Sequence, residues 1–245
     1  MTAQIFRRMM IAVLAIFCIG ASGSAHDLDP EAVKRLALEA ILENPEIVME
    51  AVQLLERREA AERERQAASA LVAERRRLEN DPNAPVVGNP MGSVTVVEFF
   101  DYNCPYCRRA KVQLDAVLRS DDDVRVVLRE WPILGEESVF AARAALAARK
   151  QDKYVVFHDA LMALRGRANE ASVMQVARQV GLDVAQLRTD MDAPEIDAHI
   201  DASMELARSI GFSGTPSFVV GDTLVPGFIE ADAMSAHIEK AREGS

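Results

Sequence analysis

Two cysteines three positions apart constrain this chain more than any other feature. Cys104 and Cys107 enclose Pro105 and Tyr106, and they follow a β-branched and aromatic run, residues 94–100, that is typical of a buried strand. A helix is predicted to begin at the first cysteine. A Cys-X-X-Cys pair at such a junction is typical of a redox pair. We therefore expect an α/β sheet domain with its chemistry where this strand meets the helix.

Residues 1–25 predict a secretory signal peptide. Two arginines precede an apolar run, residues 9–19, and small residues ending at Ala25 suit a cleavage site there. An uncleaved membrane anchor is the alternative, but the run is short for a hydrocarbon core of about 30 Å. Lipid attachment at Cys18 is disfavoured because a bulky aromatic residue precedes it. We expect export and cleavage near Ala25, with no stable membrane span afterwards.

Charge and cysteine content further limit the classes of function that the chain can have. Removal of the signal peptide also removes Cys18, so the exported chain keeps a single cysteine pair in a compartment where disulfides persist. The chain has 28 basic and 38 acidic residues and a net charge of -10. This balance argues against a nucleic-acid partner, because clustered basic charge provides most of that attraction.

The exported chain is predicted to have two unlike parts. Residues 26–80 form a helical extension, with helix-start signals at residues 29–31 and 44–46. Residues 29–55 carry an apolar stripe too small for a stable core of its own, so it must pack on the main domain or on copies of itself. The stretch that follows is highly charged and is typical of a solvated or bridging helix. Breaker residues then mark the start of a domain at 81–245.

The order of elements in this second domain indicates an α/β sheet with a helical insertion. The sequence predicts a central strand followed by a helix, a second strand, several helices, a hairpin and a last helix. The predicted ranges are 94–100, 104–119, 124–131, 136–180 with two or three helices, 184–191, 195–210, 216–225 with a turn at 221–222, and 230–241.

Position on the predicted helix assigns different roles to the two cysteines. Free N–H groups and the helix dipole favour an anion at a helix N-terminus, so Cys104 is expected to have a lowered pKa and to attack. Cys107 lies one turn further in, is expected to be more buried, and would resolve the mixed disulfide. Arg108 and Arg109 follow directly and could add positive potential.

Three other readings of the pair remain open at this stage. A structural disulfide across four residues would restrain the unfolded chain by only about 2 kcal/mol. A structural zinc site needs four ligands, and the histidines show no ligand spacing beside the pair. A reduced, inert pair fits poorly with an oxidising compartment. The four histidines are His26, His158, His199 and His237.

Two segments resemble a known family. Residues 98–107, Glu-Phe-Phe-Asp-Tyr-Asn-Cys-Pro-Tyr-Cys, resemble the active-site segment of periplasmic DsbA-like thioredoxin-fold oxidoreductases, and residues 214–218 resemble the segment that carries that family's cis-proline loop. The resemblance covers roughly residues 85–243. It implies a thioredoxin fold with an inserted helical subdomain and a periplasmic location. It also implies a cis Pro216 beside the cysteines, with Thr215 offering backbone groups to an extended substrate.

The resemblance also gives Glu98 a role. An acid on a central strand is costly to bury unless it is useful. The family places an acid here as a proton-transfer group near the inner cysteine. The alternative is an acid at a strand end that pairs with a lysine or arginine.

Two residues depart from the simple oxidases of this family. Those proteins usually carry His where this chain has Tyr106 and Val where it has Thr215, and both residues here are closer to the dimeric isomerases. The extension also resembles the oligomerisation segment of the ScsC-like branch (suppressor of copper sensitivity), whose members can be trimeric.

Together these features predict a periplasmic thiol–disulfide oxidoreductase that needs no cofactor and no metal. Its partners would be unfolded or misoxidised secreted proteins and a membrane redox partner, and a homo-oligomer through residues 29–55 would favour isomerisation or reduction. One alternative is a monomeric disulfide donor. An alternative of another class is a Cu(I)-binding or chaperone module that uses Cys104 and Cys107 as soft ligands.

Overall fold

A computed structural model describes residues 29–244 and divides the chain into two compact units, one up to Glu59 and one from Ala60 onward. The predicted signal peptide, Cys18 and His26 lie outside the described residues. Each unit is considered by itself below. No helix within 29–244 has both the length and the apolar character needed to cross a bilayer.

Two helices occupy the N-terminal extension. Helix α2 (Pro30–Glu43) begins where the sequence predicts, because the side chain of Asp29 accepts a hydrogen bond from the Glu31 N–H at 3.2 Å and proline occupies the first helical position. Helix α3 (Glu46–Glu79) starts at the second predicted signal. The apolar stripe of α2 has no buried residue. This leaves its apolar side chains exposed.

The C-terminal part of α3 differs from the solvated helix that its charges suggest. Leu71 and Leu78, seven residues apart on one helix face, are 2% and 1% exposed, whereas Val72 is 73% exposed. Both leucines pack with residues of the sheet domain. The second compact unit begins at Ala60, inside the helix, about twenty residues before the domain boundary that the sequence predicts at residue 81. The end of the helix belongs to this unit because its two leucines pack on the sheet domain.

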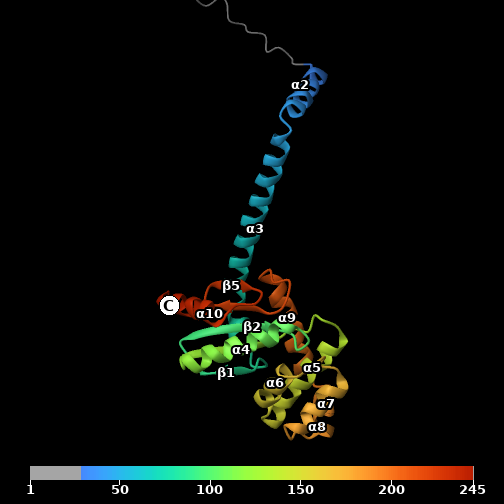
Figure 1. Cartoon of the computed structure of the whole chain (residues 1–245), viewed down its shortest axis with the longest axis vertical. Coiled ribbons are helices and arrows are strands. Elements are labelled where there is room, and N and C mark those ends of the chain that lie inside the picture. Colours follow the sequence, from blue (N-terminus) through green and yellow to red (C-terminus); the bar gives the residue numbers. More distant parts are fainter. Residues whose placement is uncertain (1–28, 245) are drawn as a thin grey trace, which may run out of the picture. The chain divides into compact units, whose positions relative to one another are not determined.

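The second unit is built on a five-stranded sheet with the order β1-β3-β2-β4-β5 (Figure 1). The central strand β2 runs parallel to β3 and antiparallel to β4. This mixed sheet confirms the predicted thioredoxin fold. The edge strand β1 was not predicted, since it has three residues between two breaker clusters. The strands are β1 (Val86–Gly88), β2 (Val94–Phe100), β3 (Val124–Glu130), β4 (Ser217–Val220) and β5 (Thr223–Pro226).

Alternate residues of β2 face two different layers of helix. Val96 and Phe100 join the core beneath α4 (Pro105–Ser120) and α10 (Ala231–Glu243). Val97 and Phe99 face a second core formed with α9 (Pro194–Ser209) and with the end of α3. The central strand is therefore buried on both faces, as its continuous apolar sequence predicts. The second core includes Val97, Phe99, Leu206, Ile210, Leu71 and Leu78.

A group of helices is inserted between β3 and β4, as the resemblance implied, and Figure 1 shows α5 to α8 gathered beside the sheet. Every alanine of the alanine-rich α5 is buried, which suits the small side chains of this helix face. The inserted helices are α5 (Glu136–Ala147), η1 (Ala148–Gln151), α6 (Tyr154–Met162), α7 (Glu170–Gln179), α8 (Val184–Asp190) and α9 (Pro194–Ser209).

The hairpin of β4 and β5 turns at Gly221, as predicted. This glycine has a φ of +55°, and a Cβ added to it would lie 2.7 Å from the Cβ of Ala241 in α10. Both the backbone conformation and the close helix therefore favour glycine. The turn ties the last strand pair to the last helix.

Candidate active site

The loop between β2 and α4 is held by one buried acid. Asp101 accepts hydrogen bonds from the Asn103 N–H at 2.7 Å and from the Leu134 N–H at 2.9 Å, and its carbonyl accepts the Cys104 N–H at 3.0 Å. These bonds form a tight turn directly before the helix. Cys104 is the N-cap residue of α4, and Pro105 occupies the first helical position, where it needs no N–H partner.

The two cysteines are free thiols in different surroundings. Cys104 is 5% exposed and Cys107 is fully buried. Hydrogen bonding to the Cys104 sulfur, first from the Cys107 thiol and then from the N–H groups of Cys107 and Tyr106, outweighs burial and lowers its pKa to about 6. Burial, together with the neighbouring Cys104, raises the pKa of Cys107 well above its usual value. One sulfur is therefore ionised at neutral pH while the other is protonated.

A distant segment completes the site. The Thr215–Pro216 peptide bond is cis, as the resemblance implied. It lies beside the cysteine pair, because the Cys104 thiol donates a hydrogen bond to the Thr215 carbonyl at 3.2 Å. The fold thus brings together the predicted residues of two segments more than 100 positions apart.

Glu98 lies on the same face of β2 as Val96 and Phe100, beneath α4. It is fully buried, and neither of its carboxylate oxygens has a hydrogen-bond partner among the described residues. Burial raises its pKa to about 8, although the charge of Lys111 opposes this shift. Lys111 itself bonds Asp115 at 2.6 Å and pairs with Asp159 at 2.9 Å, so it does not neutralise Glu98 by direct contact.

Comparison with known proteins agrees with this geometry. Residues 95–239 match the DSBA-like thioredoxin domain. The chain belongs to this family. Residues 30–62 match a second family, the N-terminal domain of the copper resistance protein ScsC, which covers the apolar stripe of the extension.

Solved structures similar to this DSBA-like chain include relatives with and without the extension. A thioredoxin-like oxidoreductase from Silicibacter pomeroyi DSS-3 is 61% identical, with a TM-score of 0.69 over 70% of this chain and 99% of that one. Proteus mirabilis ScsC in a transitional conformation is 29% identical, with a TM-score of 0.67 over 88% of this chain and 95% of that one. The second likeness extends to the helical extension.

Curated relatives of the DSBA-like chain include longer proteins. A Na(+)/H(+) antiporter NhaA 1 from Salinispora arenicola is 30% identical over 168 residues, which are 67% of this chain and 26% of that protein. The chain therefore spans about a quarter of the length of this relative.

A buried polar network behind the active-site loop was not predicted. The Glu130 Oε1 atom accepts hydrogen bonds from the Tyr102 hydroxyl at 3.0 Å and the Tyr154 hydroxyl at 2.9 Å. The Nδ1 atom of His158 lies 3.0 Å from the Tyr102 hydroxyl, and we assign it as the donor because that hydroxyl donates to Glu130. Burial lowers the pKa of His158 to about 3 and raises that of Glu130. The network joins the loop, the end of β3 and α6.

Some signals for this network were visible in the sequence of the DSBA-like domain. Glu130 ends a strand that is parallel to β2, and in the register it pairs with Phe100, the last residue before the loop. Tyr154 and His158 are four residues apart and so share one face of α6. What the sequence lacks is the docking of α6 against the sheet, which brings these residues to Tyr102.

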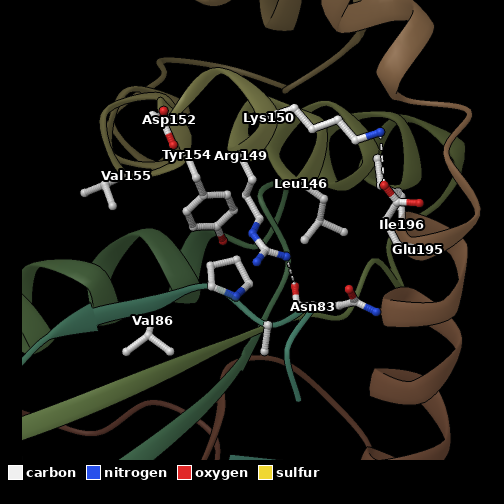
Figure 2. Close-up of a pocket in the computed structure, with 12 residues that line it drawn as sticks. Asn83, Val86, Leu146, Arg149, Lys150, Asp152, Tyr154, Val155, Glu195 and Ile196 are labelled. Atoms are coloured by element: carbon white, nitrogen blue, oxygen red, sulfur yellow. Dashed lines mark hydrogen bonds and ion pairs between the residues drawn. The ribbon is translucent and has the colours of Figure 1, made fainter. Parts of the chain in front are cut away.

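In the described part of the chain, neither a metal-binding cluster nor the cavity drawn in Figure 2 belongs to this site. Within residues 29–244, no three His, Cys, Asp or Glu side chains meet in a way that could hold a metal ion. A cavity of about 700 Å³ lies between β1, α5, α6 and the start of α9 (Figure 2). None of the predicted site residues lines it. Its cationic side chains already have partners, since Arg149 donates to the carbonyls of Asn83 and Pro82 and Lys150 pairs with Glu195.

Proposed function

We propose that this protein is a thiol–disulfide oxidoreductase that exchanges disulfides with secreted proteins through Cys104 and Cys107. The observation that carries the proposal is the contrast between the two thiols. With a pKa of about 6, most Cys104 side chains are thiolates at pH 7. The thiolate is the nucleophile in disulfide exchange, and the buried, protonated Cys107 reacts only later, when it resolves the mixed disulfide.

Each step of the exchange forms one sulfur–sulfur bond and breaks another. The Cys104 thiolate attacks one sulfur of a client disulfide, which forms a mixed disulfide and releases the other client sulfur as a thiolate. Cys107 then loses its proton and attacks Cys104, which forms the Cys104–Cys107 disulfide and releases the second client thiolate. The client gains two electrons and the protein loses two; the reverse sequence oxidises a client dithiol. When a client thiolate resolves the mixed disulfide instead, the client is isomerised without net oxidation.

Glu98 is proposed to take the proton of Cys107. With a pKa of about 8, Glu98 is mostly protonated at neutral pH; its ionised fraction accepts the Cys107 proton, and its protonated form returns a proton to Cys107 in the reverse step. Its charge is close enough to contribute to the raised pKa of Cys107. The absence of a hydrogen-bond partner for Glu98 among the described residues supports this role over that of a paired structural acid.

The remaining predicted residues are proposed to bind the client and to help lower the pKa of Cys104. Thr215 and Pro216 would hold the client as an added strand, since the Thr215 carbonyl lies next to the attacking sulfur. Pro105 and Tyr106 support the site, because the Tyr106 N–H contributes to the lowered pKa of Cys104.

Self-association through residues 29–55 is proposed to favour isomerisation or reduction. Apolar side chains are exposed throughout this stretch, with Leu36 at 60% and Leu42 at 71%. A surface of this kind needs a partner, and a second copy of the chain fits because the stretch matches the ScsC N-terminal family. Residues 26–80 would then serve as oligomerisation segment and linker, and residues 81–245 as the catalytic domain.

The location follows from the predicted signal peptide. We propose that residues 1–25 are removed near Ala25 and that the protein acts in the periplasm, where a membrane redox partner would reset the cysteine pair. Structural likeness to a periplasmic thioredoxin-like protein from Salmonella enterica serovar Typhimurium, 31% identical with a TM-score of 0.63, supports this setting.

The variant Cys104→Ser tests the activity. Loss of insulin reduction and of scrambled-ribonuclease refolding is expected, whereas Cys107→Ser should accumulate mixed disulfides with the client. Unchanged activity of Cys104→Ser would overturn the proposal.

Light scattering on the mature chain tests the oligomer: a single-chain mass would favour the monomeric disulfide donor. Tight Cu(I) binding without exchange activity would favour the metal-binding module.

A further inference from the structure

Arg109 is held between two aromatic rings at the edge of the active site. Its guanidinium carbon lies 4.5 Å from the centroid of the Phe228 ring and 5.6 Å from that of the Tyr106 ring. Both distances fall within the range of cation–π attraction. Arg109 and Tyr106 are three residues apart on α4, and Phe228 comes from the segment after β5. The cation is therefore fixed in place and exposed.

The other cations near the cysteines are already engaged. Arg108 donates to the carbonyls of Tyr102 and Leu164, and Lys111 pairs with two aspartates. No carboxylate in the described part of the chain pairs with Arg109. A guanidinium that lies over aromatic rings makes no hydrogen bond to them, so its N–H groups stay free to bind a carboxylate through two hydrogen bonds.

The stack also borders the place where a client would lie. Tyr106 stands between the two cysteines. On the other side, the Gly227 N–H, directly before Phe228, donates to the Pro216 carbonyl at 2.9 Å. Arg109 follows Cys104 by five residues, a rise of about 7.5 Å along a helix. An extended client spans that distance in two to three residues, at about 3.3–3.6 Å each.

We propose that Arg109, positioned by Tyr106 and Phe228, binds an Asp or Glu side chain that lies one to three residues from the client's reactive cysteine. This inference rests on the proposed exchange activity and adds a preference among clients. The chain carries a net charge of -10, which repels acidic proteins in general. Arg109 therefore selects an acidic neighbour of the cysteine rather than an acidic client as a whole.

Two dithiol peptides that differ only in Glu or Gln two residues from each cysteine test this preference. They reduce the oxidised protein and become disulfides themselves, and acid quenching with mass spectrometry gives the second-order rate constants. Each rate constant is divided by the rate constant of the same peptide with a small aromatic disulfide. This ratio corrects for any difference in intrinsic thiol reactivity between the two peptides. We expect the Glu peptide to react about fivefold faster at low salt, an effect typical of one partly shielded ion pair.

Three variants and one change of salt separate the possible causes. Arg109→Gln should bring the ratio to one, and Phe228→Leu, which keeps the charge but removes one ring, should lower it part of the way. Arg119→Gln removes the same charge from the last turn of α4 and should leave the ratio unchanged. The preference should also shrink in 0.5 M NaCl.

Equal rates for both peptides with the wild-type protein would overturn the inference while leaving the proposed function intact. A ratio that survives Arg109→Gln would overturn it as well. If neither peptide exchanges with the wild-type protein, the proposed function fails, and the client preference fails with it.

Discussion

The Cys104 thiol donates a hydrogen bond to the carbonyl oxygen of Thr215 at 3.2 Å. When Cys104 ionises, the proton of this bond is lost, and the carbonyl no longer has a donor there. An extended client that brings a backbone N–H to Thr215 would replace it. Ionisation would therefore prepare the proposed nucleophile and, at the same time, free the carbonyl oxygen that is proposed to bind the client.

The pKa of Cys104 should depend on the side chain at position 107. The Cys107 thiol makes the largest contribution to lowering it to about 6. Cys107→Ala removes this donor and should raise the pKa of Cys104 by about one to two units, the value of a hydrogen bond to a charged group. Thiolate absorbance at 240 nm during a pH titration measures it. Cys107→Ser keeps a donor and should stay near 6; identical titrations of the two variants would contradict the assignment.

Glu98 should make stability fall as pH rises. Its pKa is raised from 4.5 to about 8 in the folded state, so between these values the folded protein holds a proton that the unfolded chain lacks. The free energy of unfolding should then decrease by up to about 1.4 kcal/mol per pH unit. Glu98→Gln removes this slope, so the variant should gain stability over the wild type as pH rises from 5 to 8.

Urea unfolding of the disulfide form measures this gain, because the cysteines then do not titrate. The difference between variant and wild type also cancels His158, whose lowered pKa acts in the opposite direction below pH 6.5. Glu136→Gln, which changes an exposed acid, is the control for the loss of one carboxyl group. Parallel curves for Glu98→Gln would refute the buried-acid assignment.

The Tyr102 hydroxyl should stabilise the active-site loop. Tyr102→Phe leaves His158 without its acceptor and Glu130 with one donor fewer, both fully or nearly buried. We expect a loss of about 1–3 kcal/mol in the free energy of unfolding. Chemical denaturation at pH 7 measures the loss. Tyr106→Phe removes an exposed hydroxyl and should cost less than about 0.5 kcal/mol; an equal cost for both would discount the network.

The end of α3 should contribute to the stability of the sheet domain. Leu78→Ala should cost about 2–5 kcal/mol, because the side chain is 1% exposed in the second core. Val72→Ala changes the same helix where the side chain is 73% exposed and should be nearly neutral. Thermal unfolding of the two variants decides whether the domain requires this part of the helix.

The sequence predicted the framework of the site because its signals are local. The buried run of β2, the helix start predicted at Cys104, one residue before the observed start at Pro105, and the hairpin at Gly221 each depend on neighbouring residues. The cis bond at Pro216 came from resemblance alone, since nothing local distinguishes it from an ordinary loop entry.

Features that depend on tertiary packing were missed. Leu71 and Leu78 look like isolated apolar residues in a charged helix, and only the sheet beneath them makes them core. The Glu130 network requires α6 to dock on the loop. Arg109 was seen only as added positive potential, because its ring partner Phe228 lies more than 100 residues away.

Pro105 and Tyr106 are exposed, whereas the helix positions that follow them inward, from Cys107 to Leu114, include the buried contacts that anchor α4. Natural selection can therefore exchange the dipeptide between the sulfurs with little penalty to folding. We expect substitutions at these two positions to change the surroundings of the Cys104 sulfur, and with them the reduction potential of the cysteine pair, at little cost in folding free energy.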